Sequence, residues 1–217
     1  MHSHDLQGPA PDDPHPANPR AQIAGILRGR WSTRLFDPIH ELFDDELTQI
    51  MEAARWSPSA GNSQPWAFIV GRRDDPTHQR FVELLSRGNT SWAPEASALI
   101  LTLHQSAVER DSDLVLSDYA MYDLGQAVAH LTFQAQSMGL FVHQFAGFDH
   151  ERAAEVFEVP NHWTVTTGIA IARHAKAEQI AVAPESLLER ERTPRQRKEF
   201  AGFVFAERFG NPAGGWG

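Results

Sequence analysis

The sequence contains no cysteine among its 217 residues. This absence excludes a disulfide framework, a thiolate nucleophile and a zinc site built on cysteines. No apolar run approaches the roughly 18–20 residues that a transmembrane helix needs. The first twenty residues also lack the apolar segment of a secretory signal. We therefore expect a cytoplasmic protein with no membrane partner.

Positive charge is in the minority, with 19 Lys and Arg against 28 Asp and Glu and a formal net charge of -9. A chain this acidic is a poor match for nucleic acid or an anionic membrane surface. Two glycine-rich fingerprints are missing as well: no G-x-G-x-x-G follows an expected strand, and no G-x-x-x-x-G-K-[ST] occurs. These absences argue against a Rossmann site or a P-loop. If a nucleotide-like cofactor binds, arginines must hold its phosphate.

The length and the hydrophobic fraction of 41% suit one domain with a tail. Residues 1–19 are rich in Pro, His and Asp and are expected to form a disordered tail, which leaves 20–217 as the domain with its C-terminal extension. Alternating strand and helix patterns indicate an α/β or α+β fold. The expected strands are 66–72, 97–104 and 164–173, with a strand or extended loop at 140–145. The expected helices run from Pro19 to about Gly29, from the cap Asp44, from Pro76 to Gly88, over 117–138, after Asp149, and over 184–192.

The longest expected helix spans Ser117 to Met138, with Gly139 just after its end. Its apolar residues step by four and three positions, and further apolar residues lie on its other sides. A helix that is apolar on more than one side is either central to the core or part of a dimer interface.

Cations cluster in two places despite the acidic total. The stretch RGRWSTR carries Arg28, Arg30 and Arg34 around Ser32, and a later stretch, ERERTPRQRK, carries four arginines and a lysine. Phosphate groups are bound well by forked guanidinium donors together with hydroxyls. The R-x-S-x-R pattern supplies both within five residues. Ordinary surface ion pairing is the alternative interpretation.

The loop PSAGNSQPW, from Pro58 to Trp66, is the most unusual short stretch. Ser59, Asn62 and Gln64 offer donors and acceptors, and the small residues between them allow a flat ligand to approach the backbone. Such a loop suits a planar heterocycle with carbonyls and ring nitrogens. The alternative is a turn whose side chains satisfy its own backbone.

In their order along the chain, these segments resemble the FMN-dependent nitroreductase family, within the NAD(P)H-dependent flavin oxidoreductases. The resemblance rests on the basic motif, the loop PS-x-x-NSQPW, the helix YDLGQAVAHLTFQAQSMGL, the segment VHQFAGFD and the C-terminal segment PESLLERERTPRQRKEF. It covers residues 20–210. It implies an α+β fold with a mostly antiparallel central sheet flanked by helices. It also implies a homodimer with a long helix at its interface and two FMN sites there.

The resemblance further implies which residues contact FMN. The basic motif would hold the phosphate and ribityl side through Arg30, Ser32 and Arg34, with Trp31 contributing its backbone. The element Pro194-Arg195-x-Arg197 would complete the phosphate cradle. The polar loop would reach the flavin from the partner subunit through Pro58, Ser59, Asn62 and Gln64.

Two further segments are implied at the flavin ring. The loop with Gln144, Ala146 and Gly147 would pass the N5 edge and give it a backbone N–H. Asn89 would face the pyrimidine edge. The chain departs from the family at two of these places: Ala146 stands where many members have Glu, and Trp92 stands where some have Lys.

The implied activity is transfer of hydride from NAD(P)H through flavin N5 to a small electrophilic acceptor, such as a nitroaromatic or a quinone, in ping-pong order. The alternatives are an FMN-binding protein without turnover, serving as a flavin store or redox sensor, and a phosphate-binding module without flavin. No metal is implied, and no side chain qualifies as the catalytic acid. His143 is either a proton donor or a structural histidine bonded to the backbone. The choice between NADH and NADPH stays open.

Overall fold

The computed structural model describes residues 22–111 and 113–215. The expected tail, and the expected helix start at Asn18 and Pro19, lie outside these ranges. The first helix, α1 (Gly25–Gly29), begins after Ala24, and residues 22–24 are not helical. The prediction of a continuous helix from Pro19 to Gly29 is therefore wrong. No side chain caps α1 and none of its residues is buried, so little stabilises a longer helix here.

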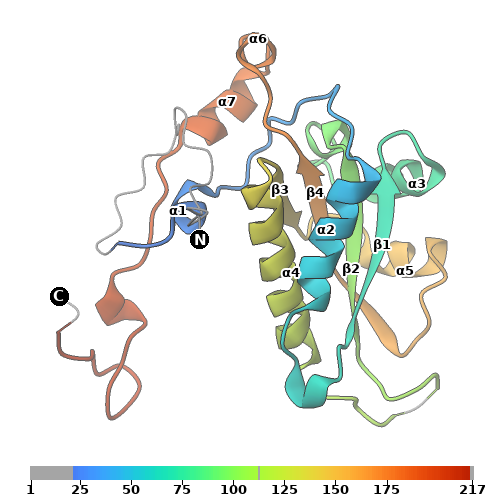
Figure 1. Cartoon of the computed structure of the whole chain (residues 1–217). Coiled ribbons are helices and arrows are strands. Elements are labelled where there is room, and N and C mark those ends of the chain that lie inside the picture. Colours follow the sequence, from blue (N-terminus) through green and yellow to red (C-terminus); the bar gives the residue numbers. More distant parts are fainter. Residues whose placement is uncertain (1–21, 112, 216–217) are drawn as a thin grey trace, which may run out of the picture.

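Four strands form one antiparallel sheet (Figure 1). They are β1 (Trp66–Arg72), β2 (Ala98–Gln105), β3 (Phe141–Phe145) and β4 (Trp163–Ala172), in the order β1-β2-β4-β3. Strand β2 is buried along nearly its whole length because it lies inside the sheet, and this explains its unbroken apolar run. The antiparallel sheet with its helices confirms the predicted α+β class.

Two helical layers cover the sheet. Alternate residues of β2 belong to different hydrophobic clusters: Ala98 and Ile100 pack with α2 (Asp44–Arg55) and α4 (Ala120–Ser137), whereas Leu99 and Leu101 pack on the other side. That other side carries α3 (Pro76–Leu84) and α5 (His150–Val156) (Figure 1). Two short helices lie in the connections, η1 (Ala60–Asn62) between α2 and β1 and η2 (Ala93–Glu95) between α3 and β2. The protein thus has two cores, one on each face of the sheet.

Local signals account for several helix boundaries. The side chain of Asp75 accepts from the backbone N–H of His78 at 2.7 Å, and Asp149 does the same for α5. Gly139 has a φ of 75°, which ends α4 in the left-handed conformation that glycine favours. The cap of α2 is Phe43 rather than the predicted Asp44, because the Glu46 side chain accepts from the Phe43 N–H.

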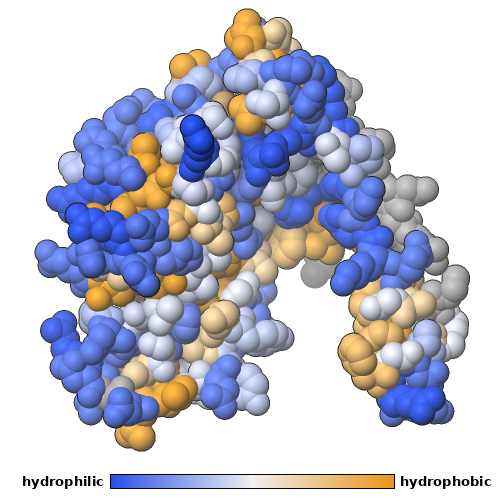
Figure 2. All heavy atoms as spheres, turned by 180° about the vertical axis from the view of Figure 1, so that it is seen from behind, coloured by the Kyte–Doolittle hydropathy of each residue, from blue (hydrophilic) through white to orange (hydrophobic). Residues whose placement is uncertain are grey.

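The C-terminal part leaves the domain body. After α6 (Ala177–Ile180) and α7 (Glu185–Arg192), the chain runs through η3 (Phe200–Gly202) as a separate leg (Figure 1). Seen from behind, this leg is divided from the body by an open hollow (Figure 2). Phe209 on the leg is 92% exposed. Among the residues described, no helix has the length and apolar character to cross a membrane.

Candidate functional site

The two basic segments of the sequence meet at one cavity of about 280 Å³, which we call the arginine cavity. The N-terminal segment and α7 with the residues that follow it supply the lining. Its described lining residues are Arg30, Trp31, Ser32, Arg190, Glu191, Thr193, Arg195 and Arg197. Four guanidinium groups in one cavity with a hydroxyl donor match the chemistry of a phosphate.

Hydrogen bonds from the Arg195 side chain hold the two segments together. Arg195 donates from Nη1 to the carbonyls of Arg28 and Arg30, at 2.7 and 2.9 Å. Arg30 in turn donates from Nη1 to Ser32 Oγ at 3.3 Å. Burial lowers the pKa of Arg30, as do the neighbouring charges of Arg197 and Arg195. Since arginine stays protonated in proteins, the cavity keeps its positive charge at neutral pH.

Arg34 does not line the arginine cavity in the described structure, although the sequence groups it with Arg30. Its Cζ lies 5.6 Å from the centre of the Trp92 ring, a cation–π arrangement. Burial and the charge of Arg190 lower the pKa of Arg34, while Glu191 opposes them. The R-x-S-x-R motif is therefore split, with Arg30 in the cavity and Arg34 on the buried tryptophan.

His143 supports this tryptophan from another direction. Its ring centre is 4.3 Å from that of Trp92, and its Nδ1 donates to the Thr33 carbonyl at 2.7 Å. Burial lowers the pKa of His143, so the ring is neutral near pH 7. These contacts correspond to the structural role for His143.

A hydrogen bond joins Asn89, three residues before Trp92, to Gly147. The Asn89 side chain is buried and donates from Nδ2 to the Gly147 carbonyl at 2.9 Å. A Cβ at Gly147 would lie 2.6 Å from both Asn89 Nδ2 and Ser86 Oγ, so any other residue would displace the Asn89 and Ser86 side chains. The flavin contact expected for Asn89 stays a prediction, and in the structure its amide holds the Gly147 loop.

Two hydrogen bonds fix the orientation of the peptide between Ala146 and Gly147. The Ala146 carbonyl accepts from the Phe148 N–H at 3.0 Å and from His150 Nε2 at 3.1 Å. In a planar trans peptide the N–H of Gly147 then points to the opposite side. Gln144 is exposed, and its Nε2 donates to Thr132 Oγ1 on α4 at 3.2 Å.

The loop PSAGNSQPW lies at the far end of α2 and α4 from α1 and α7 (Figure 1). Gly61, Asn62 and Gln64 have φ values of 59°, 57° and 50°, so three residues adopt the left-handed conformation. Ser59 Oγ accepts from the Gln64 N–H at 3.0 Å, which is the self-satisfying turn that the sequence left as an alternative. Pro58, Asn62 and Gln64 are nevertheless exposed. Within one chain, the arginine cavity and this polar loop therefore lie apart. We call these two regions the part-sites of the chain.

Asp123 anchors this polar loop and was missed at the sequence level. It is buried on α4, and its Oδ2 accepts from the Ala60 N–H at 2.9 Å. A carboxylate within an otherwise apolar helix is the signal that identifies such an anchor.

Glu191 was missed as well. Its Oε1 accepts from Trp31 Nε1 at 2.6 Å and lies 3.1 Å from His174 Nε2. Burial alone would raise the pKa of Glu191, but hydrogen bonds from His174 and Trp31 outweigh it and hold that pKa below its ordinary value. The sequence showed only a glutamate among arginines. Within residues 22–111 and 113–215, no group of three or more His, Asp or Glu side chains is arranged to hold a metal.

Acidification is expected to destabilise the fold because burial lowers the pKa of His40, His78, His104 and His143. An unfolded histidine titrates near pH ~6.5, so below that pH the unfolded chain binds more protons than the folded chain. The free energy of unfolding is therefore highest above that pH and decreases below it, down to the folded pKa values. Urea unfolding at about pH 7.5 and about pH 5.5 measures the difference.

His143→Asn is the matched control for this prediction. Asparagine can still donate to the Thr33 carbonyl but does not titrate. The variant is expected to show a smaller loss of stability on acidification than the wild type. Equal stability of the wild type at the two pH values would contradict the prediction.

Comparison with known proteins gives a consistent result. The profile of the Nitroreductase family matches residues 27–173. The chain is 39% identical over 153 residues to an uncharacterized 15.4 kDa protein in the ask 5' region of Mycolicibacterium smegmatis, covering 67% of this chain and 98% of that protein. It is 26% identical over 165 residues to the putative NAD(P)H nitroreductase YdgI of Bacillus subtilis (strain 168), covering 61% and 78%.

Solved structures extend the likeness over more of the chain. A structure described as an oxidoreductase containing FMN superposes with a TM-score of 0.82 at 30% identity, covering 93% of this chain and 99% of that one. A putative nitroreductase in complex with FMN, from Exiguobacterium sibiricum 255-15, gives a TM-score of 0.63 at 20% identity over 74% and 91% of the two chains. The second likeness shows a shared fold.

Proposed function

Because this chain belongs to the nitroreductase family, we propose that it is an FMN-dependent oxidoreductase that takes hydride from NAD(P)H and reduces a small electrophilic acceptor. The acceptor class is a nitroaromatic, a quinone or a similar compound. The FMN named for the 30% identical structure and the NAD(P)H named for the Bacillus relative support this assignment. A cytoplasmic location remains a prediction.

The observation that carries the proposal is the arginine cavity. FMN ends in a phosphate that carries close to two negative charges near neutral pH. Arg30, Arg195 and Arg197 surround a space with the donors and the charge to hold it, and Ser32 adds a hydroxyl. Thr193 and Arg190 also line this space and extend the set that the sequence predicts.

The flavin ring is assigned to the region beside the cavity. There Arg34 lies on Trp92, and Asn89 holds the Gly147 loop. In the peptide between Ala146 and Gly147, the Gly147 N–H points opposite the bonded Ala146 carbonyl, and we propose that it meets the flavin ring edge. The missing glutamate side chain at Ala146 does not affect this backbone donor. We propose that Gln144 and Trp31 contribute to the same surface, Trp31 through its backbone.

Bound FMN would supply the redox chemistry, accepting hydride from NAD(P)H and passing electrons to the acceptor in alternation. The chain supplies binding, orientation and charge. Arg34 places a permanent positive charge beside the assigned ring region, where it stabilises negative charge that develops there. The neutral His143 beside Trp92 adds no further positive charge.

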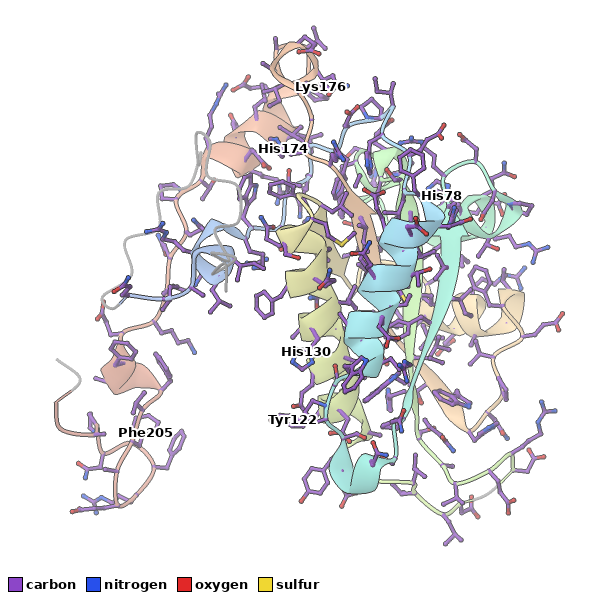
Figure 3. All side chains as sticks on the ribbon, in the orientation of Figure 1. His78, Tyr122, His130, His174, Lys176 and Phe205 are labelled. Atoms are coloured by element: carbon purple, nitrogen blue, oxygen red, sulfur yellow. The ribbon has the colours of Figure 1, made fainter. Side chains whose placement is uncertain are left out.

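A homodimer completes the proposed site. The exposed face of α4 includes Tyr122, which is 68% exposed, and continues through Gly125 and Ala129, whose small size permits close helix approach. Figure 3 shows Tyr122 on the lower part of α4 and Phe205 on the separate C-terminal leg. A second copy would bring its loop of Pro58, Ser59, Asn62 and Gln64 to the arginine cavity of the first.

The function is tested by the visible absorption spectrum of the purified protein, before and after anaerobic addition of NADH or NADPH. Bands near about 370 and 450 nm that bleach with either nucleotide are expected for a reducible flavin. Steady-state turnover with an added quinone then separates an enzyme from a flavin store or sensor. Flat absorbance even after FMN is added would refute the proposal.

The dimer is tested by size-exclusion chromatography with light scattering at micromolar protein concentration. We expect twice the chain mass of 24.2 kDa. A purified protein that is monomeric at this concentration and still binds FMN would contradict the two-chain site, because each chain holds its part-sites at opposite ends of α4.

A further inference from the structure

Glu191 is an acidic side chain in the lining of the arginine cavity, where the other charged residues among those described are arginines. It is only 8% exposed. A buried carboxylate repels a phosphate bound in the same cavity. If the cavity binds a phosphate, Glu191 must stabilise the site in some other way that offsets this repulsion.

The contacts of Glu191 show what that contribution is. Oε1 meets the indole N–H of Trp31 and the imidazole of His174, and Oε2 lies 3.5 Å from the Arg34 backbone N. Within the described part of the chain, no arginine side chain of the cavity forms an ion pair with this carboxylate. Figure 3 shows His174 beside α7, at the end of β4. The carboxylate therefore joins three segments of the chain.

These segments are the ones that carry the cavity. Arg30 directly precedes Trp31, and Arg195 and Arg197 follow the end of α7, which contains Glu191. The Trp31 ring also packs edge-on against Phe141 at 4.6 Å and His174 at 5.5 Å, which anchors it to the sheet. A shift of Glu191 would change the separation of the guanidinium groups across the cavity.

We propose that Glu191 is a positioning residue of the arginine cavity. Through Trp31 and His174, it holds the segment carrying Arg30 against the segment carrying Arg195 and Arg197. The geometric gain for a phosphate exceeds the repulsion from its own charge. This inference rests on the proposed function, because the phosphate in question is that of FMN.

Two substitutions at Glu191 separate geometry from charge. Glu191→Gln removes the charge but keeps an acceptor for Trp31, so FMN should bind as tightly as in the wild type or up to about 5-fold more tightly. Glu191→Ala removes the charge and both contacts, so FMN should bind roughly 10-fold more weakly. Fluorescence titration of the apoprotein with FMN gives the dissociation constants, and a parallel titration with riboflavin, which has no phosphate, should show no such loss.

Two further variants complete the design. Trp31→Phe leaves the carboxylate charged but removes the indole N–H that links it to the Arg30 segment, so it should weaken FMN binding in the same direction as Glu191→Ala. If Glu191→Ala does not fold, Trp31→Phe alone tests whether the contact between Glu191 and Trp31 supports FMN binding. Glu189→Gln changes the charge of an exposed neighbour on α7 by the same amount and should alter binding by less than about 2-fold.

Several results would overturn the positioning role. One is Glu191→Ala binding FMN as tightly as Glu191→Gln, since charge alone would then explain both. Others are an equal loss of riboflavin binding, which indicates general damage, and an unaffected Trp31→Phe. If the wild type binds no flavin, the proposed function fails, and calorimetry with inorganic phosphate on the same variants tests the cavity by itself. No phosphate binding by the wild type would then overturn the inference too.

Discussion

Replacing Trp92 by alanine is expected to lower the free energy of unfolding by about 3–5 kcal/mol. Trp92 is 0% exposed and is among the largest fully buried side chains. Its ring contacts those of His143 and Phe145, with ring centres 4.3 and 5.6 Å away, and its Nε1 donates to the Gly88 carbonyl at 3.1 Å. Alanine would leave a cavity between the sheet and the loops of the site, and it would also release Arg34.

Urea unfolding of the protein without FMN, at one fixed protein concentration, measures this loss. Trp92→Phe keeps an aromatic ring beneath Arg34 but loses the bond to Gly88, so a smaller loss of about 1–2 kcal/mol is expected. Val182→Ala, at a residue that is 84% exposed, should change stability by no more than about 0.5 kcal/mol. A Trp92→Ala variant as stable as Val182→Ala would contradict the assignment of Trp92 as a core residue.

Replacing Arg30 or Arg197 by alanine is expected to weaken FMN binding by about 1.5–3 kcal/mol each, or roughly 10- to 150-fold. Each substitution removes a guanidinium from the arginine cavity, where a hydrogen bond to a charged phosphate is worth this much. The two losses should not add fully in the double variant, because both arginines serve one phosphate.

The measurement is again a titration with FMN and with riboflavin. Only FMN binding should fall, since riboflavin makes no phosphate contact. Arg152→Ala is the control, because Arg152 lies on α5 in an exposed pair with Glu155. If Arg30→Ala and Arg197→Ala both bind FMN like the wild type, the phosphate site lies elsewhere.

The sequence predicts best the features that are decided within a few residues. The bounds of β1 match the prediction, and Asp75, Asp149 and Gly139 act as the predicted helix boundaries. A cap bonds to a backbone group only three residues away, so the chain needs no tertiary contact to define it.

The failures arise where packing decides. The predicted continuous helix up to Gly29 fails at residues 22–24, which are not helical, and α1 begins at Gly25. Ile23 and Leu27 are both substantially exposed, so no apolar face is buried to extend the helix. Ser117 similarly forms a turn before α4 begins, because its Oγ accepts from the Tyr119 N–H.

The sequence indicated several residues that the structure brings to one cavity, but it did not indicate their arrangement. Motif order indicated that Arg30 and Arg195 would serve one ligand, and the structure places both at one cavity. The position of Arg34 on Trp92 depends on residues far apart in the chain, which no local pattern encodes. The same holds for the Glu191 contact with Trp31, which joins residues 160 positions apart.

The separation of the two part-sites along α4 has a genetic consequence. In a symmetric pair, each site would take its arginine cavity from one chain and its polar loop from the other. A loop mutant and a cavity mutant would each be inactive alone. A mixed pair would place both lesions in one site and leave the other intact. A loop allele and a cavity allele would therefore complement one another on co-expression, restoring about a quarter of all sites at equal dosage.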